Sequence, residues 1–304
     1  SYSPVCFPNP VQFTENNNTG GRPVISRYWE FGDAATGTNS NPSHAYAAPG
    51  SYTARFALIT DVGCLSDTTS HIVTVSPLPT ATVAGTVAVC QNGAAPAITF
   101  TGASGTAPYT FTYTINGGAA LTVTSTGNTA TVTAPTTTPG TFTYSLVSVQ
   151  DASPAACSQP QTGSAIVTVN PLPSATISGT NTVCQHATAP AVTFTGATGT
   201  APYTFTYTIN GGAPLTVTTT SGNSVTVNVP TTTPGIYTYA LVNVTDGTST
   251  ACTQNQTGSV SVTVNPLPTA TISGTTEQCE NGSSPFVTFT GATGTAPYTF
   301  YYRI

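Results

Sequence analysis

The chain has 304 residues, a length that suits about three domains of ordinary size, and 38% of its residues are hydrophobic. Only 4% of the residues are charged, the net charge is −5, and there is no lysine, so the sequence offers no basic patch for the phosphates of a nucleic acid. No apolar stretch approaches the roughly 20 residues that a membrane-spanning helix needs. The composition therefore excludes a nucleic-acid partner and a spanning helix.

The first 76 residues carry an ordered set of motifs: "YWEFGD" at 28–33, "NPSHAY" at 41–46, "PGSY" at 49–52 and "GC" at 63–64. Together they resemble the PKD domain, an immunoglobulin-like β-sandwich of large surface and secreted proteins. The sequence departs from that family at Ala34, where a glycine usually follows, and the turn there can differ. The residues that carry the resemblance are Trp29, Phe31, Gly32, Asp33, His44, Tyr46 and Tyr52.

The rest of the chain is a tandem array with a period near 95 residues. The linkers "SPLPT", "NPLPS" and "NPLPT" begin their Pro-Leu-Pro runs at Pro77, Pro171 and Pro266, which are 94 and 95 residues apart. This period exceeds the 20–50 residues of solenoid repeats, so each copy is a domain. We expect a PKD-like domain at 1–76, a first repeat at 77–170, a second repeat at 171–265 and a truncated third repeat at 266–304.

The strands of a repeat follow from alternation in the sequence. In "YTFTYTI" (203–209) aromatic residues and Ile209 occupy one face and threonines the other, which is typical of a half-buried strand. The "NGG" that follows is a strong hairpin signal. About seven such strands fit in one repeat, and no segment has helical spacing. We predict an all-β chain of tandem immunoglobulin-like and PKD-like antiparallel β-sandwiches arranged end to end.

Seven cysteines in a lysine-free, threonine-rich chain indicate an oxidising compartment. Similar spacings predict three disulfides, each within one domain: Cys6–Cys64, Cys90–Cys157 and Cys184–Cys252. In the chain-entropy model, each bond would stabilise its domain by roughly 4 kcal/mol. Cys279 aligns with Cys90 and Cys184, and its partner would lie near position 346, beyond the sequence. The alternative for Cys279 is a free thiol or a bridge to another chain.

The later repeats, with "VCQ", "TFTGATGTAPYTFTYTINGG" and "PLP", resemble immunoglobulin-like repeats of very long surface adhesins of gliding bacteria. That resemblance implies an extracellular or outer-surface location and, for many such proteins, export by the type IX secretion system. We expect as partners other copies of the chain or neighbouring repeats of a longer one, with surface glycans as the alternative.

Catalytic and metal sites find little support. The three histidines, His44, His71 and His186, lie in unrelated contexts, and the closest carboxylate pair, Glu30 and Asp33, fits a turn. Asp61, Asp151 and Asp246 end equivalent strands and are expected to cap turns, with calcium as the alternative. Thr68 in "DTT" fits a bacterial O-glycosylation pattern, with an ordinary loop as the alternative.

These observations predict a non-enzymatic protein without a cofactor: a stalk or filament segment of a long secreted or surface adhesin, whose proline linkers make a stiff rod. Because charged edge strands are absent, rods could also associate laterally, or a foreign strand could complete the third repeat. The alternative is a set of glycan- or surface-binding accessory modules of a secreted hydrolase.

Overall fold

The computed structural model describes residues 1–274 and 277–304, and all regular secondary structure within these ranges is β-strand. Within the same ranges, no helix has the length and apolar character needed to cross a membrane. The chain divides into two compact units, Ser1–Val169 and Asn170–Ile304. The all-β prediction is confirmed.

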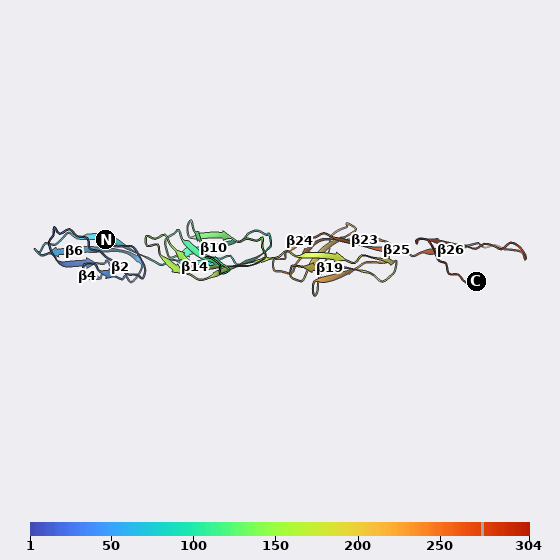
Figure 1. Ribbon diagram of the computed structural model, residues 1–304, viewed down its shortest axis with the longest axis horizontal. Coiled ribbons are helices and arrows are strands. Elements are labelled where there is room, and N and C mark those ends of the chain that lie inside the picture. Colours follow the sequence, from blue (N-terminus) through green and yellow to red (C-terminus); the bar gives the residue numbers. More distant parts are fainter. Residues whose placement is uncertain (275–276) are drawn as a thin grey trace. The chain divides into compact units, whose positions relative to one another are not determined.

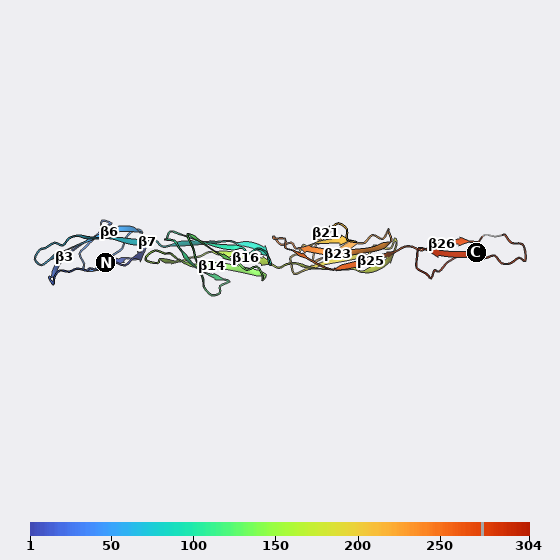
Figure 2. The same cartoon turned by 90° about the horizontal axis from the view of Figure 1, so that it is seen from above.

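The N-terminal domain holds a mixed five-stranded sheet in the order β1-β7-β6-β3-β4 and a two-stranded ladder of β2 and β5. Long β6 pairs with β3 on one side and β7 on the other (Figure 2). Short β1 joins β7 in parallel through the pairs Val5–Val75 and Cys6–Ser76. The strands are β1 (Val5–Cys6), β2 (Val11–Gln12), β3 (Val24–Glu30), β4 (Thr36–Gly37), β5 (Ser43–His44), β6 (Gly50–Thr60) and β7 (Thr69–Ser76).

The first repeat is a sandwich of two sheets, in the orders β13-β10-β8 and β12-β11-β14-β16-β9, with β15 attached to β14. Figure 1 shows β10 and β14, which belong to different sheets. The strands are β8 (Thr80–Ala84), β9 (Val87–Cys90), β10 (Ala97–Ala103), β11 (Thr110–Ile115), β12 (Leu121–Thr124), β13 (Thr129–Thr133), β14 (Gly140–Gln150), β15 (Ser158–Pro160) and β16 (Ser164–Asn170).

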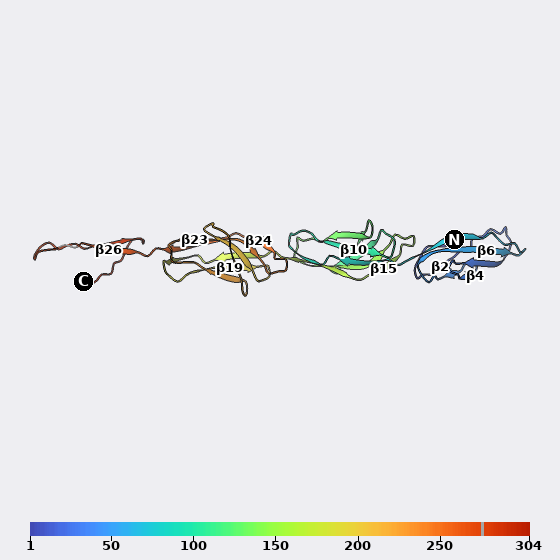
Figure 3. The ribbon, with the colours of Figure 1, turned by 180° about the vertical axis from the view of Figure 1, so that it is seen from behind.

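The second repeat has the same topology, with sheets β17-β19-β22 and β18-β25-β23-β20-β21, and β24 attached to β23 (Figure 3). The strands are β17 (Ser174–Ser178), β18 (Asn181–Cys184), β19 (Ala191–Ala197), β20 (Thr204–Ile209), β21 (Leu215–Thr218), β22 (Ser224–Asn228), β23 (Gly235–Thr245), β24 (Thr253–Asn255) and β25 (Ser259–Asn265). After it, β26 (Thr269–Ser273) and β27 (Thr288–Ala292) form an antiparallel pair.

Alternation determines which side chains enter the core. In β20 Phe205 is fully buried and Tyr207 is 6% exposed, while the threonines that alternate with them are only half-buried. The hairpin after β20 places Asn210 and Gly211 at positive φ (50° and 70°), as an Asn-Gly turn requires. These details confirm the strand and turn predicted there.

The first and second repeats each have nine strands rather than about seven. The two additional strands in the second repeat, β18 and β24, have four and three residues. They are too short to show a clear period, yet β18 runs parallel to β25 up to the pair Cys184–Asn265. This short strand fixes the position of a cysteine at one end of the sandwich.

Candidate functional site

One disulfide joins the N-terminal domain to the first repeat. Cys6 is the last residue of β1 and pairs with Ser76, the last residue of β7. Cys157 directly precedes β15. Their sulfurs are 2.07 Å apart and their Cα atoms 5.5 Å apart, across a sequence separation of 151 residues. The bond therefore lies beside the linker 77–79, which connects β7 to β8, so two connections link the sandwiches.

A buried aspartate holds the cysteine loop of the first repeat. Asp151 is 5% exposed. Its Oδ1 accepts hydrogen bonds from the Ser153 hydroxyl (2.7 Å), the Cys157 N–H (2.9 Å) and the Ser153 N–H (3.2 Å), and its Oδ2 accepts one from the Thr106 N–H (3.0 Å). The carboxylate thus fixes Cys157, itself fully buried, in place for the disulfide.

The second repeat builds the same loop around Asp246, whose Oδ1 accepts bonds from the Thr248 hydroxyl (2.7 Å) and the Cys252 N–H (3.0 Å). Asp151 and Asp246 therefore both cap turns in the structure. Asp61, their sequence counterpart, is exposed and lies 3.8 Å from Arg22 instead.

The pairings Cys6–Cys64, Cys90–Cys157 and Cys184–Cys252 are wrong. Cys6 bonds to Cys157, and Cys64 and Cys184 are free and exposed. The reason is visible in the second repeat, where Cys184 lies beside Asn265, near the start of β23. The Cys252 N–H instead donates a hydrogen bond to Asp246, just after the end of β23. The 11 residues of β23 separate those ends by about 36 Å, whereas bridged Cα atoms lie within about 7 Å.

The remaining cysteines divide into two groups. Cys90 and Cys252 are disulfide-bonded. Cys279 is free and exposed in this chain, as are Cys64 and Cys184. A bond of Cys279 to a cysteine outside the sequence stays a prediction.

The motif residues of the N-terminal domain form its aromatic core. Trp29, Phe31 and Tyr46 are 5%, 3% and 4% exposed, and the Tyr46 hydroxyl donates a hydrogen bond to the Phe31 carbonyl (2.9 Å). The Tyr52 ring stacks on Tyr46 at 4.0 Å. Gly32 has φ +88°, and a Cβ there would lie 2.7 Å from the Thr53 carbonyl oxygen, so only glycine fits.

His44 and Asp33 hold the turn at the edge of this core. His44 Nε2 lies 2.7 Å from Asp33 Oδ2, and its ring stacks on Phe31 at 4.2 Å. Burial alone would raise the pKa of Asp33, but hydrogen bonds from His44 and the Ala35 N–H outweigh it and hold the pKa below 3.8. Ala34 has φ +72°, so the turn keeps the backbone that a glycine would favour.

Burial, with smaller contributions from the charges of Asp33 and Tyr52, raises the pKa of Tyr46 to about 12. The hydroxyl therefore stays protonated and keeps its bond to the Phe31 carbonyl throughout the physiological pH range. Together the histidine, aspartate and tyrosine serve packing and turn formation.

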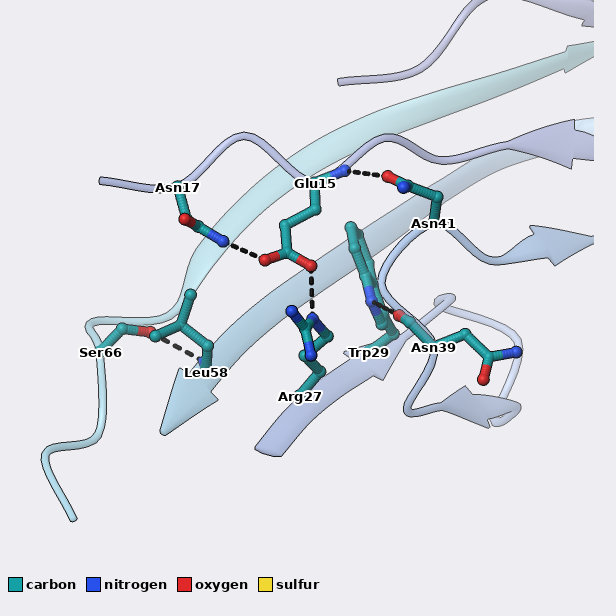
Figure 4. A network of polar contacts seen from close by, with 8 residues as sticks. All are labelled: Glu15, Asn17, Arg27, Trp29, Asn39, Asn41, Leu58 and Ser66. Atoms are coloured by element: carbon teal, nitrogen blue, oxygen red, sulfur yellow. Dashed lines mark hydrogen bonds and ion pairs between the residues drawn. The ribbon is translucent and has the colours of Figure 1, made fainter. Parts of the chain in front are cut away.

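A second polar network, absent from the sequence predictions, anchors the segment after β2 onto β3 (Figure 4). The Glu15 carboxylate accepts hydrogen bonds from Arg27 Nε (2.5 Å) and the Asn17 amide, and the Glu15 N–H donates to Asn41 Oδ1 (2.9 Å). Beside it, a cavity of about 280 Å³ is lined by residues that include Phe13, Glu15, Trp29, Arg55, Phe56 and His71. The sequence gives no sign of this ion pair, because Arg27 lies 12 residues after Glu15 and neither residue belongs to a recognisable motif.

The other candidate residues do not converge. Glu30 lies 3.7 Å from Arg55, whereas Asp33 lies 2.7 Å from His44, and His186 is exposed in a turn with φ 65°. Thr68 is exposed just before β7, where glycosylation stays a prediction. In the described part of the chain, no group of three or more His, Cys, Asp or Glu side chains could hold a metal.

Comparisons with known proteins agree with this assignment for the first domain. Residues 2–75 match the family of the PKD domain. A microbial collagenase of Vibrio alginolyticus is 34% identical over 65 residues, which are 21% of this chain and 8% of the collagenase. The chain therefore spans a small part of the curated relative that it matches.

Several solved structures are similar to the chain at low sequence identity. An I-band fragment of titin has a TM-score of 0.46 at 10% identity, covering 87% of this chain and 95% of the fragment. A structure of a 1.5-MDa bacterial ice-binding adhesin has a TM-score of 0.37 at 17% identity, covering 84% of this chain and 90% of that structure. The Escherichia coli adhesin FdeC has a TM-score of 0.37 at 14% identity, covering 85% of this chain and 95% of that structure. Residues 2–75 are thus similar to the PKD domain, and the sheets of the two repeats that follow form a sandwich in each.

Proposed function

We propose that this chain is a non-enzymatic spacer, a stalk or filament segment of a long adhesin-like protein outside the cell. The observation that carries the proposal is the Cys6–Cys157 disulfide. It ties two successive sandwiches together beside a linker of three residues, Pro-Leu-Pro. A short proline linker and a covalent bridge both limit bending, and a disulfide persists in an oxidising compartment.

The path of the chain through the first repeat supports end-to-end stacking. The chain enters the first repeat at Thr80, which pairs with Ala103. Two residues after Ala103, a Cβ added to Gly105 would contact both Pro79 and Asp151. The entry point therefore lies near Asp151, at the end of β14. It leaves after Val169, which pairs with Gly140 at the start of β14. The two connections therefore lie at opposite ends of an 11-residue strand, about 36 Å apart. We name these the proximal and distal ends of a repeat.

Small-angle X-ray scattering on the oxidised chain tests the proposal. Three sandwiches of about 36 Å stacked in a line give a radius of gyration near 35 Å, against about 19 Å for a compact protein of this length. We expect a value of 30 Å or more, about the rod estimate, by the same reasoning. A value near the compact estimate would contradict a spacer.

A second candidate function is binding of a glycan or another surface polymer by an accessory domain of a secreted hydrolase. The match of the N-terminal domain to part of a collagenase and the cavity beside Trp29 favour it. Glycan arrays and immobilised collagen, probed with the full chain, test it. Binding that is lost in Arg55→Ala and kept in Arg22→Ala, an exposed arginine outside the cavity lining, would support this alternative.

A further inference from the structure

The disulfide between Cys6 and Cys157 changes how tension passes along the chain. The two cysteines are 151 positions apart in the sequence. Residues 7–156, from before β2 to beyond β14, therefore lie inside a covalent loop. That loop holds most of the N-terminal domain and most of the core of the first repeat.

We infer that this bond is a covalent bypass, which carries tension past the two sandwiches and keeps them from being pulled open. The inference rests on the proposed spacer function and names its mechanical design. Force applied ahead of Cys6 crosses the sulfur–sulfur bond to Cys157 and continues along residues 158–170. The linker 77–79 and the strands of the loop stay outside this path.

The segment after Cys157 has little slack to give. Ser158 pairs with Gln150 and Val169 pairs with Gly140, so the segment already runs the length of β14. Thirteen residues pulled straight reach about 44 Å, while the 11 residues of β14 span about 36 Å. Stripping this segment from its sheet would lengthen the molecule by only about 10 Å by the same estimates.

Without the bond, the loop is a large reserve of length. About 150 residues at 3.3–3.6 Å each amount to roughly 500 Å of chain. A spacer without the bypass would lengthen severalfold when its sandwiches open, and it would expose their cores. The bypassed chain holds its length whether or not those sandwiches unfold.

The same placement of cysteines occurs further along the chain. Cys90 closes β9 in the first repeat as Cys6 closes β1, and Cys252 follows Asp246 as Cys157 follows Asp151. Both are disulfide-bonded. A test of Cys6–Cys157 alone must therefore remove these two cysteines.

The experiment stretches single molecules of the full chain by handles at its two termini. The test chain carries Cys90→Ser and Cys252→Ser, and the control chain carries Cys6→Ser and Cys157→Ser in addition. We expect the fully stretched test chain to be about 500 Å shorter than the control. Dithiothreitol should abolish the difference: its two thiols become a cyclic disulfide, and their two electrons and two protons pass to the cysteine sulfurs.

Equal lengths of the test and control chains before reduction would overturn the inference. If the substituted background does not fold, the unmodified chain provides the test: its peptides, mapped without reduction, must include Cys6 joined to Cys157, and any other pairing of these two cysteines would overturn the inference. Failure here with a large radius of gyration in solution would leave a spacer without a bypass. Failure of both measurements would remove the spacer as well.

Discussion

Replacing Asp151 by alanine should destabilise the first repeat and loosen the junction that Cys157 makes. The carboxylate accepts four hydrogen bonds, and it is only 5% exposed. Hydrogen bonds to a charged group contribute about 1.5–3 kcal/mol each, and buried donors left without a partner cost about 1–3 kcal/mol. Because water can enter the vacated space, we expect a net loss of about 3 kcal/mol, the lower part of that sum.

Scanning calorimetry measures this loss, with the transition of the second repeat as an internal reference. For a domain of this size, 3 kcal/mol corresponds to a fall in Tm of about 12–24 °C. Asp61→Ala is the matched control, since Asp61 ends the equivalent strand but is exposed, with Arg22 at 3.8 Å. Surface pairs of this kind contribute about 0–1 kcal/mol. Equal effects of the two substitutions would refute the role given to the buried carboxylate.

Three further predictions concern single side chains. Because the folded pKa of Tyr46 is about 12 and its ordinary value 10.0, stability should be full below pH 10 and fall as the pH rises towards 12; chemical denaturation across that range should show less of this fall in Tyr46→Phe. Gly102→Ala would place a Cβ 2.5 Å from the buried Tyr109 ring and should cost about 1–3 kcal/mol, while Gly127→Ala, with nothing within 4 Å, should be neutral in the same thermal melts. Ala34→Gly should stabilise the first domain by about 0.5–1 kcal/mol, since it relieves φ +72°, and an unchanged melting temperature would contradict that strain.

The strands of the repeats were predictable because burial imposes a period of two on them. Phe205 and Tyr207 face the core as alternation requires, and Asn210 and Gly211 make the turn. The motif residues Trp29, Phe31 and Tyr46 were identified through the resemblance to the PKD domain, and the structure buries them as large aromatic side chains in the core of a small domain.

The disulfide partner could not be read from spacing, because the chain is periodic. In a tandem array, the position that could pair with a cysteine recurs in its own repeat and in the next one, so spacing alone does not distinguish the two partners. Only the end of the sandwich at which each sulfur lies separates the two possibilities. That end is set by β1, a two-residue strand parallel to β7, which is too short to be recognised in the sequence.

Asp61 and Asp151 show a second limit of alignment. Both follow the long strand that begins with Pro-Gly and Tyr or Phe. Five residues separate Asp151 from Cys157, enough for a loop that folds back on the carboxylate, whereas two separate Asp61 from Cys64. Loop length, rather than the aspartate itself, decides whether the carboxylate is buried and whether the following cysteine is held.

A repeat that carries both halves of a junction can be copied without further change. In the second repeat Cys184 lies at the distal end, beside Asn265, and Cys252 lies at the proximal end, fixed by Asp246. The observed bond of Cys6 to Cys157 joins one distal cysteine to one proximal loop. Duplication of such a unit would supply each new linker with both cysteines, so the spacer that we propose could lengthen with two cysteines at every added junction. A disulfide within each repeat would stabilise single sandwiches and leave the linkers between them as the only path for tension.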